Sequence, residues 1–255
     1  MTTDSILTLL ALLLSVASVV ATGFFSIRTQ RLSHELDAER EMRREEQSAL
    51  KAAERVYEPL AQSAAELQSR IYNIVESGWF GMQDRYKEHR DYAEASTAYL
   101  FAQYFGWVEA RRQAVLSSGG EGSRDIAVQR LMDAVLKTLR RSEGSGGFLF
   151  FTTEQRAIGE LMSYRRSTGE LAVRGYAWFV ERYRHEEEFS NWFEPVRIGM
   201  RLFAEGDNQR LVAIQHALVA LIDELDPKRK YTVGFALEPI DLSDGTHATP
   251  SGRPA

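Results

Sequence analysis

The chain has 255 residues, of which 44% are hydrophobic and 26% are charged, so it can bury a core and is neither a disordered nor a collagen-like polymer. It contains no cysteine, which excludes disulfide scaffolds, thiol nucleophiles and cysteine-ligated metal centres. A net charge of −5 argues against a nucleic-acid partner, and the predominance of arginine over lysine indicates a GC-rich bacterial genome.

Residues 5–27 contain no charged side chain and consist mainly of Leu, Val, Ala, Ile and Phe. A helix of about 20 such residues spans the hydrocarbon core of a bilayer, so residues 1–27 are expected to form a single transmembrane anchor. Asp4 precedes the segment, whereas Arg28 and Arg31 follow it. Positive charge favours the cytoplasmic side, which predicts an external N-terminus and a cytoplasmic C-terminal domain at the inner or plasma membrane.

A cleaved signal peptide is the competing interpretation, because Val19 and Ala21 resemble the small residues before a cleavage site. The segment lacks a basic beginning, however, and its apolar stretch is long for a signal peptide, which favours a permanent anchor. Small residues recur at steps of three or four and predict self-association into a homo-oligomer, although such residues are also ordinary in membrane helices: Ala11, Ser15, Ser18 and Thr22.

Residues 28–55 are rich in both acidic and basic side chains and contain neither glycine nor proline. This composition predicts a solvated helical stalk that continues out of the membrane. A parallel coiled coil would need apolar residues throughout its heptads, but the series Leu36, Arg43, Leu50 is interrupted by charge. The stalk is therefore predicted to form a weak coiled coil at most.

Residues 56–240 show the apolar spacing of packed helices and are expected to form a multi-helix bundle, so the predicted fold is mainly α. The segment from Tyr92 to Leu116 is apolar nearly all round and should lie in the middle of the bundle. Thr152 and Gln155 have capping-box spacing. About seven helices are expected. Five lie near residues 60–76, 92–116, 123–139, 152–162 and 169–187. A sixth is capped by Asn191 and has Pro195 in its first turn, and the last follows Asp207 and ends before Asp226.

Beyond Pro227 the pattern changes, because apolar and other residues alternate from Tyr231 to Leu237. Alternation of this kind predicts a short strand, and Phe148 to Phe151 is its candidate partner. The fold is therefore expected to contain at most one short β-hairpin. Residues 241–255 are rich in Asp, Ser, Gly, Pro and Thr and are expected to be a disordered tail.

The sequence contains no motif that predicts a catalytic site. Neither a phosphate-binding glycine loop nor a Gly-x-Ser-x-Gly nucleophile elbow is present. Glu181 and His185 share one helical face, but no second pair of this kind supplies the remaining ligands of a metal centre. No metal and no cofactor are therefore expected.

Two clusters remain as candidate binding sites. Glu154, Arg156 and Glu160 lie close together in the sequence, and His185 could complete a polar cleft with them, although capping and ordinary ion pairing also explain the acids. The second cluster is the aromatic run from Tyr176 to Phe193. It could stack bases or contact lipid headgroups, but its arginines are balanced by glutamates and core packing explains it better.

These features predict a membrane-anchored, non-enzymatic interaction or regulatory protein whose partners are the lipid bilayer, an unknown protein and a second copy of the chain. The alternatives are a membrane-bound enzyme with a site dispersed over several helices, and an effector that assembles in the membrane. A deep polar cleft around Arg156, Glu160 and His185 would favour the enzyme.

Overall fold

The computed structural model describes residues 36–37, 40–44, 55–77, 87–118, 123–141, 147–204 and 208–241. The predicted anchor, the predicted tail after residue 241 and the small residues expected to mediate self-association lie outside these ranges, the last being Ala11, Ser15, Ser18 and Thr22. Among the residues that the structure describes, no helix is both long enough and apolar enough to cross a membrane.

The chain divides into two compact units, Met1–Leu50 and Lys51–Ala255. The described part of the first unit is helical and exposed, and Arg40 Nη1 lies 3.2 Å from the Asp37 Oδ1 atom one turn earlier. Two apolar side chains in this part, Leu36 and Met42, are exposed to solvent.

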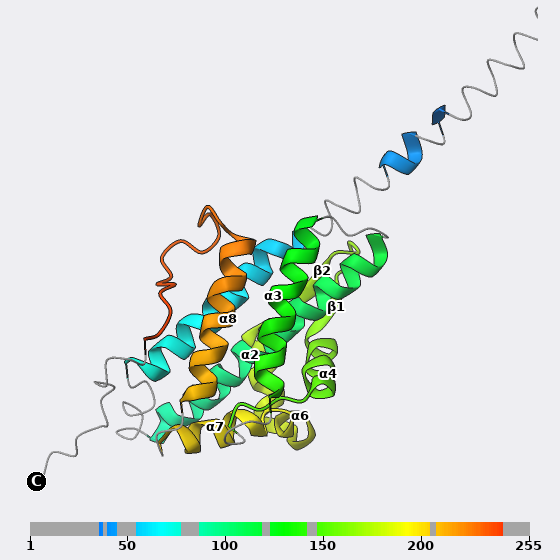
Figure 1. The fold of residues 1–255 in the computed structure, drawn as a ribbon. Coiled ribbons are helices and arrows are strands. Elements are labelled where there is room, and N and C mark those ends of the chain that lie inside the picture. The colour runs from blue at the N-terminus through cyan, green and yellow to red at the C-terminus, as the bar shows by residue number, and fades with distance from the viewer. Residues whose placement is uncertain are drawn as a thin grey trace, which may run out of the picture. The chain divides into compact units, whose positions relative to one another are not determined.

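The second unit is mainly helical, as the periodicity predicts, and contains one small sheet (Figure 1). Its first described element is a helix over residues 55–75. The elements that follow are α2 (Lys87–Ser118), α3 (Ser123–Arg140), α4 (Thr152–Met162), β1 (Ser163–Arg165), β2 (Leu171–Val173), α5 (Tyr176–His185), α6 (Glu187–Asn191), α7 (Glu194–Ala204) and α8 (Gln209–Leu225).

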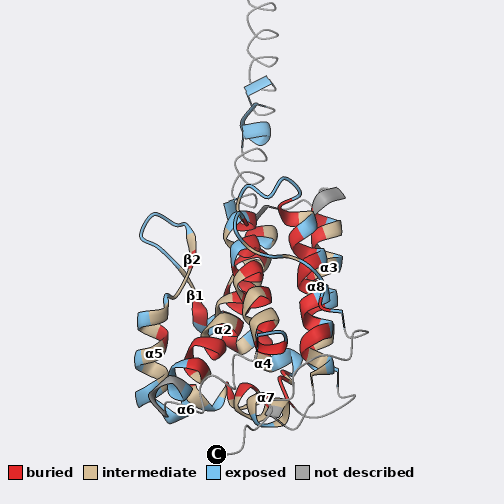
Figure 2. Cartoon of the chain, turned by 90° about the vertical axis from the view of Figure 1, so that its left-hand side faces the viewer, coloured by how far each residue is buried: buried red, intermediate tan, exposed pale blue. Residues whose placement is uncertain are grey.

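Helix α2 lies in the middle of this unit, as its apolar surface predicts. It packs against α4, α5, α7 and both strands, while α3 lies alongside α8 (Figures 1 and 2). The side chains of Phe101, Tyr104 and Phe105 are fully buried on α2, and Leu60, Leu67 and other residues of the helix over 55–75 join the same core. Burial of these side chains is the main favourable contribution to folding.

The predicted strand over Tyr231–Leu237 and its pairing with Phe148–Phe151 are wrong, and the one short hairpin in the described residues is formed elsewhere. The only sheet within the described ranges pairs β1 with β2 in antiparallel register, with Ser163 opposite Val173. Residues 232–240 instead form turns and an extended segment whose backbone is held by α8. Gln215 Nε2 donates to the Glu238 carbonyl at 2.8 Å, and Gln215 Oε1 accepts the Ile240 N–H at 3.2 Å, so a side chain replaces a neighbouring strand.

The helix expected over residues 169–187 also differs, because its beginning is taken by the β1–β2 turn and by β2. Gly169 has a φ of +84°, which suits a glycine in that turn. The helical part begins only at Tyr176, and the chain breaks again at Glu186 before α6.

Candidate functional site

Three of the four residues expected to bind a ligand lie on α4, but each is engaged locally. Glu154 Oε2 accepts the Phe151 N–H at 2.7 Å, so Glu154 closes the first turn of α4. Phe151, rather than Thr152, is the residue before the helix, and the predicted capping box is therefore misplaced by one residue. Arg156 Nε and Glu160 Oε1 form an ion pair at 3.1 Å, with more than half of each side chain exposed.

His185, the fourth residue, ends α5, where its Nε2 lies 3.6 Å from Glu181 Oε1. Both side chains are mostly exposed. The structure therefore brings together Arg156 and Glu160 but leaves His185 in a separate surface pair. Within the described residues no group of three or more His, Asp or Glu side chains could hold a metal ion.

A charged pair on α2 lies within electrostatic reach of α4, which the sequence does not reveal. Arg112 donates to both carboxylate oxygens of Glu109, at 2.7 and 2.6 Å. Burial raises the pKa of Glu109, but the hydrogen bonds from Arg112 and Gln113 and the charge of Arg156 outweigh it, so the pKa lies below its usual value. The charge of Arg156 on α4 therefore favours the ionised form of the buried Glu109 on α2.

The aromatic run from Tyr176 to Phe193 forms core, which supports the packing interpretation. Phe179, Phe189 and Phe193 are buried, with ring centroids 5.0–5.6 Å apart. The guanidinium groups of Arg174 and Arg182 lie 5.1 and 4.9 Å from the centroid of the Trp178 ring. These cation–π contacts engage Arg174 and Arg182, two of the three arginines within residues 174–193 that could otherwise have faced a nucleic acid or a lipid.

A second polar cluster lies between the helix over residues 55–75 and α2. Arg70 Nη1 donates to Ser96 Oγ at 2.8 Å and to Thr97 Oγ1 at 2.9 Å. Burial lowers the pKa of the Arg70 guanidinium and raises the pKa of the Glu66 carboxyl, which accepts a hydrogen bond from Gln103. This cluster fixes the two helices in register.

A buried charge network ties the first turn of the helix over 55–75 to α2 and α3. The Tyr57 hydroxyl donates to the Asp125 carboxylate, which also lies 3.5 Å from Arg111 Nη2. Arg111 Nη1 donates to Gln129 Oε1 at 2.6 Å, and Gln129 Nε2 donates to Asp133 Oδ1 at 2.9 Å. Both charges of the buried pair therefore have partners, as burial of an ion pair requires.

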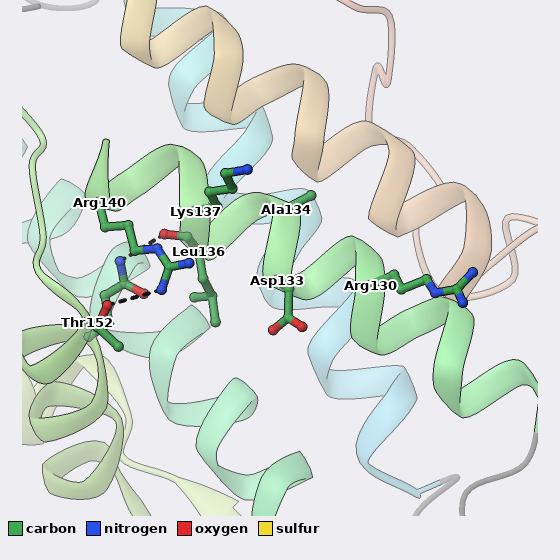
Figure 3. A pocket seen from close by; sticks show the side chains of 8 residues that line it. Arg130, Asp133, Ala134, Leu136, Lys137, Arg140 and Thr152 are labelled. Carbon is green, nitrogen blue, oxygen red and sulfur yellow. Dashed lines mark hydrogen bonds between the residues drawn. The ribbon is translucent and has the colours of Figure 1, made fainter. Parts of the chain in front are cut away.

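The described residues enclose a groove of about 580 Å³ along α3 and the start of α4, here called the α3–α4 groove. Figure 3 shows Arg130, Asp133, Lys137 and Arg140 spaced along α3, with Thr152 beside Arg140. Ala134, Leu136 and Gln155 complete the lining. Three cations against one carboxylate give this groove a net positive charge.

No acidic side chain among the described residues forms an ion pair with the cations of the groove. Within the part of the chain that the structure describes, Arg130 and Lys137 make neither a hydrogen bond nor an ion pair, and Arg140 Nη1 donates only to Thr152 Oγ1, at 3.3 Å. Asp133 is engaged by Gln129, on the side of the buried network. The arrangement can therefore attract an anion.

Sequence reasoning did not identify this groove, although the spacing contained a usable signal. Arg130, Lys137 and Arg140 follow each other at seven and three residues, which places them along one side of α3. The contribution of α4 could not be foreseen without the packing of α4 beside α3. Comparisons of the chain with known protein families, with curated proteins and with solved structures give no match.

Proposed function

We propose that the protein is a membrane-anchored, non-enzymatic interaction or regulatory protein that presents a helical domain to the cytoplasm. The uncharged segment over residues 5–27, followed by Arg28 and Arg31, carries this proposal. The compact unit Lys51–Ala255 supports it, because a unit with its own core can act as a binding module at the end of a tether.

A binding role is favoured over catalysis because the candidate acids and bases are already engaged in local hydrogen bonds and ion pairs. Glu154 closes the first turn of α4, Glu160 pairs with Arg156, and His185 pairs with Glu181 at the surface. The α3–α4 groove offers one carboxylate and several cations, which suits recognition of a charged group. Self-association through the small residues of the anchor remains part of the proposal.

The topology can be tested by cysteine labelling, because the native chain supplies no background thiol. Ser167 lies exposed in the β1–β2 turn, so Ser167→Cys should leave the fold intact. A membrane-impermeant maleimide should not label Ser167→Cys in intact cells but should label it after lysis. The protein should be recovered in the membrane fraction. Thr3→Cys, on the other side of the proposed anchor, should be labelled in intact cells.

Labelling of Ser167→Cys in intact cells would contradict the cytoplasmic placement. Recovery of the protein from the soluble fraction would contradict the anchor itself. Loss of the Thr3→Cys signal together with a smaller product would identify the segment as a cleaved signal peptide.

A further inference from the structure

We propose that the α3–α4 groove binds a small phosphate-bearing molecule, with its phosphate at Lys137 and Arg140 and a hydroxyl group at Asp133. The proposal deepens the proposed function, because it assumes that the domain is a binding module and names the chemistry of its ligand. The groove of about 580 Å³ has the size of a small-molecule site, for which about 300–1,000 Å³ is usual.

The phosphate position follows from two neighbouring cations. Lys137 and Arg140 are three residues apart on α3, so their side chains are neighbours on the helix surface. Arg140 uses one Nη1 bond for Thr152 and retains further N–H donors, while Lys137 has no partner within the described ranges. A dianion between them gains charge-assisted hydrogen bonds and relieves the repulsion between like charges.

The first turn of α4 is a poorer position for the anion, although it borders the groove. The Glu154 carboxylate already accepts the Phe151 N–H there, so a negative charge occupies the positive end of the helix dipole. The geometry therefore places the phosphate on the α3 side of the groove, at Lys137 and Arg140.

Asp133 determines what the remainder of the ligand must offer. It lies one turn before Lys137 and lines the same groove, where its carboxylate repels a second anionic group and accepts hydrogen bonds. A hydroxyl group satisfies it. Arg130 and Arg140 are ten residues apart, which corresponds to about 15 Å along α3 and matches a molecule of nucleotide size better than a bare phosphate ion.

The base of the groove is held rigidly before any ligand arrives. Gln155 is almost fully buried, and its Nε2 donates to the Leu136 carbonyl at 3.1 Å and to the Phe150 carbonyl at 2.8 Å. These bonds fix the start of α4 against α3, so binding orders little of the backbone and costs little conformational entropy.

The test uses the full chain in a neutral detergent and isothermal titration calorimetry. Adenosine 5′-monophosphate should bind saturably, inorganic phosphate more weakly, and adenosine not at all. The double variant Lys137→Gln/Arg140→Gln should weaken binding of the monophosphate about tenfold or more, a loss typical of charge-assisted contacts. Asp133→Asn should reduce the preference for the monophosphate over inorganic phosphate.

The matched control is Arg184→Gln/Lys228→Gln, which also removes one arginine and one lysine, both exposed and outside the groove. It should leave the Kd within about twofold of the native value. Thermal unfolding of each variant confirms that it folds, and the single variant Lys137→Gln serves if the double variant does not. Equal binding of adenosine and its monophosphate, equal weakening by both double variants, or no saturable binding would overturn the proposal.

A competition experiment with lipids identifies whether the phosphate belongs to a lipid headgroup or to a soluble molecule. Phosphatidic acid or phosphatidylcholine is added to the micelles, and displacement of the monophosphate by phosphatidic acid alone assigns a lipid headgroup to the groove. Absence of displacement assigns a soluble phosphomonoester. Binding in detergent does not depend on which side of the membrane the domain occupies, so this proposal and the topology can fail separately.

Discussion

Four hydrogen-bond donors surround Asp226, the residue that follows the last turn of α8. Its carboxylate accepts the N–H groups of Lys230, Tyr231 and Thr232 at 2.7–2.9 Å and the Thr232 hydroxyl at 3.0 Å. Burial raises the pKa of Asp226, but these donors favour the charged form more strongly, so the pKa lies below its ordinary value of 3.8. One side chain thus ends α8 and turns the chain back along it.

Asp226→Asn should lower the free energy of unfolding by about 1–3 kcal/mol at neutral pH, because the amide NH₂ group faces backbone donors. The folded pKa is depressed, so the charge stabilises the fold above the unfolded pKa, near 3.8, and this contribution is lost as the pH falls through the folded value. Urea unfolding at pH 7 and at about pH 3 measures the effect. The difference in free energy of unfolding between the native protein and Asp226→Asn should be smaller at the lower pH.

Asp223→Asn provides the matched comparison, since within the described residues Asp223 forms only an exposed ion pair with Arg229. Its effect should stay below about 0.5 kcal/mol. A difference between native protein and Asp226→Asn that is the same at both pH values would show that the charge of Asp226 does not stabilise the fold.

Contacts between residues that lie far apart in the sequence could not be predicted from local patterns. Tyr57 and Asp125 are 68 positions apart, and neither belongs to a motif that predicts a buried ion pair with Arg111. The acids on α4 are close in the sequence, which predicts a shared site, yet proximity along one helix produces ordinary capping and pairing. Local patterns reveal which side chains share a helix face, whereas a site depends on what packs opposite that face.

At the scale of elements, α4 approaches α2 unusually closely at Gly159. A Cβ atom at this position would lie 2.7 Å from the Phe105 carbonyl oxygen and 3.0 Å from Glu109 Cβ. The glycine costs α4 about 1 kcal/mol of helix propensity relative to alanine. Close packing of the two helices offsets that cost, as expected for a glycine inside a helix.

Gly159→Ala should therefore destabilise the protein by about 1–3 kcal/mol despite the better helix propensity of alanine, because a backbone oxygen cannot move aside as a side chain can. Thermal unfolding measures the effect. Gly175→Ser is the control, since a Cβ atom at Gly175 meets nothing within 4 Å and serine suits this position before α5. Equal stability of Gly159→Ala and the native protein would show that the helices can separate at little cost.

Helical elements were predictable from apolar spacing, but the strand was not. The alternation from Tyr231 to Leu237 is genuine, and a strand would need a neighbouring strand to accept its hydrogen bonds. Gln215 on α8 supplies part of that pairing through a side chain, and His216 Nε2 lies 2.8 Å from the Ile240 carbonyl oxygen. Alternation with a period of two does not distinguish a segment whose backbone bonds to a neighbouring strand from one whose backbone bonds to side chains.

At the scale of the whole molecule, the core of the second unit reaches the first turn of the helix over residues 55–75. Val56 is buried with Ala110 and Ala114 of α2, and the Tyr57 hydroxyl donates to Asp125 on α3. The boundary at residues 50 and 51 therefore precedes the first side chains that the domain needs.

Two truncations test where the domain begins. A fragment over residues 51–255 should unfold cooperatively and within about 3 °C of the corresponding transition of the full chain in detergent, because it keeps the entire core. A fragment over residues 59–255 lacks Val56 and Tyr57, so it loses buried apolar area and leaves Arg111 and Asp125 without their aromatic neighbour. Its Tm should fall by about 10 °C, which corresponds to about 3 kcal/mol.

The two fragments differ by only eight residues, so a difference in length does not explain such a change. Coincident melting of both fragments would place the beginning of the domain after residue 58 and remove the argument that Tyr57 completes the buried network. Failure of the longer fragment to fold would show that the domain depends on the preceding unit, and the tether would then be part of the fold as well as the attachment.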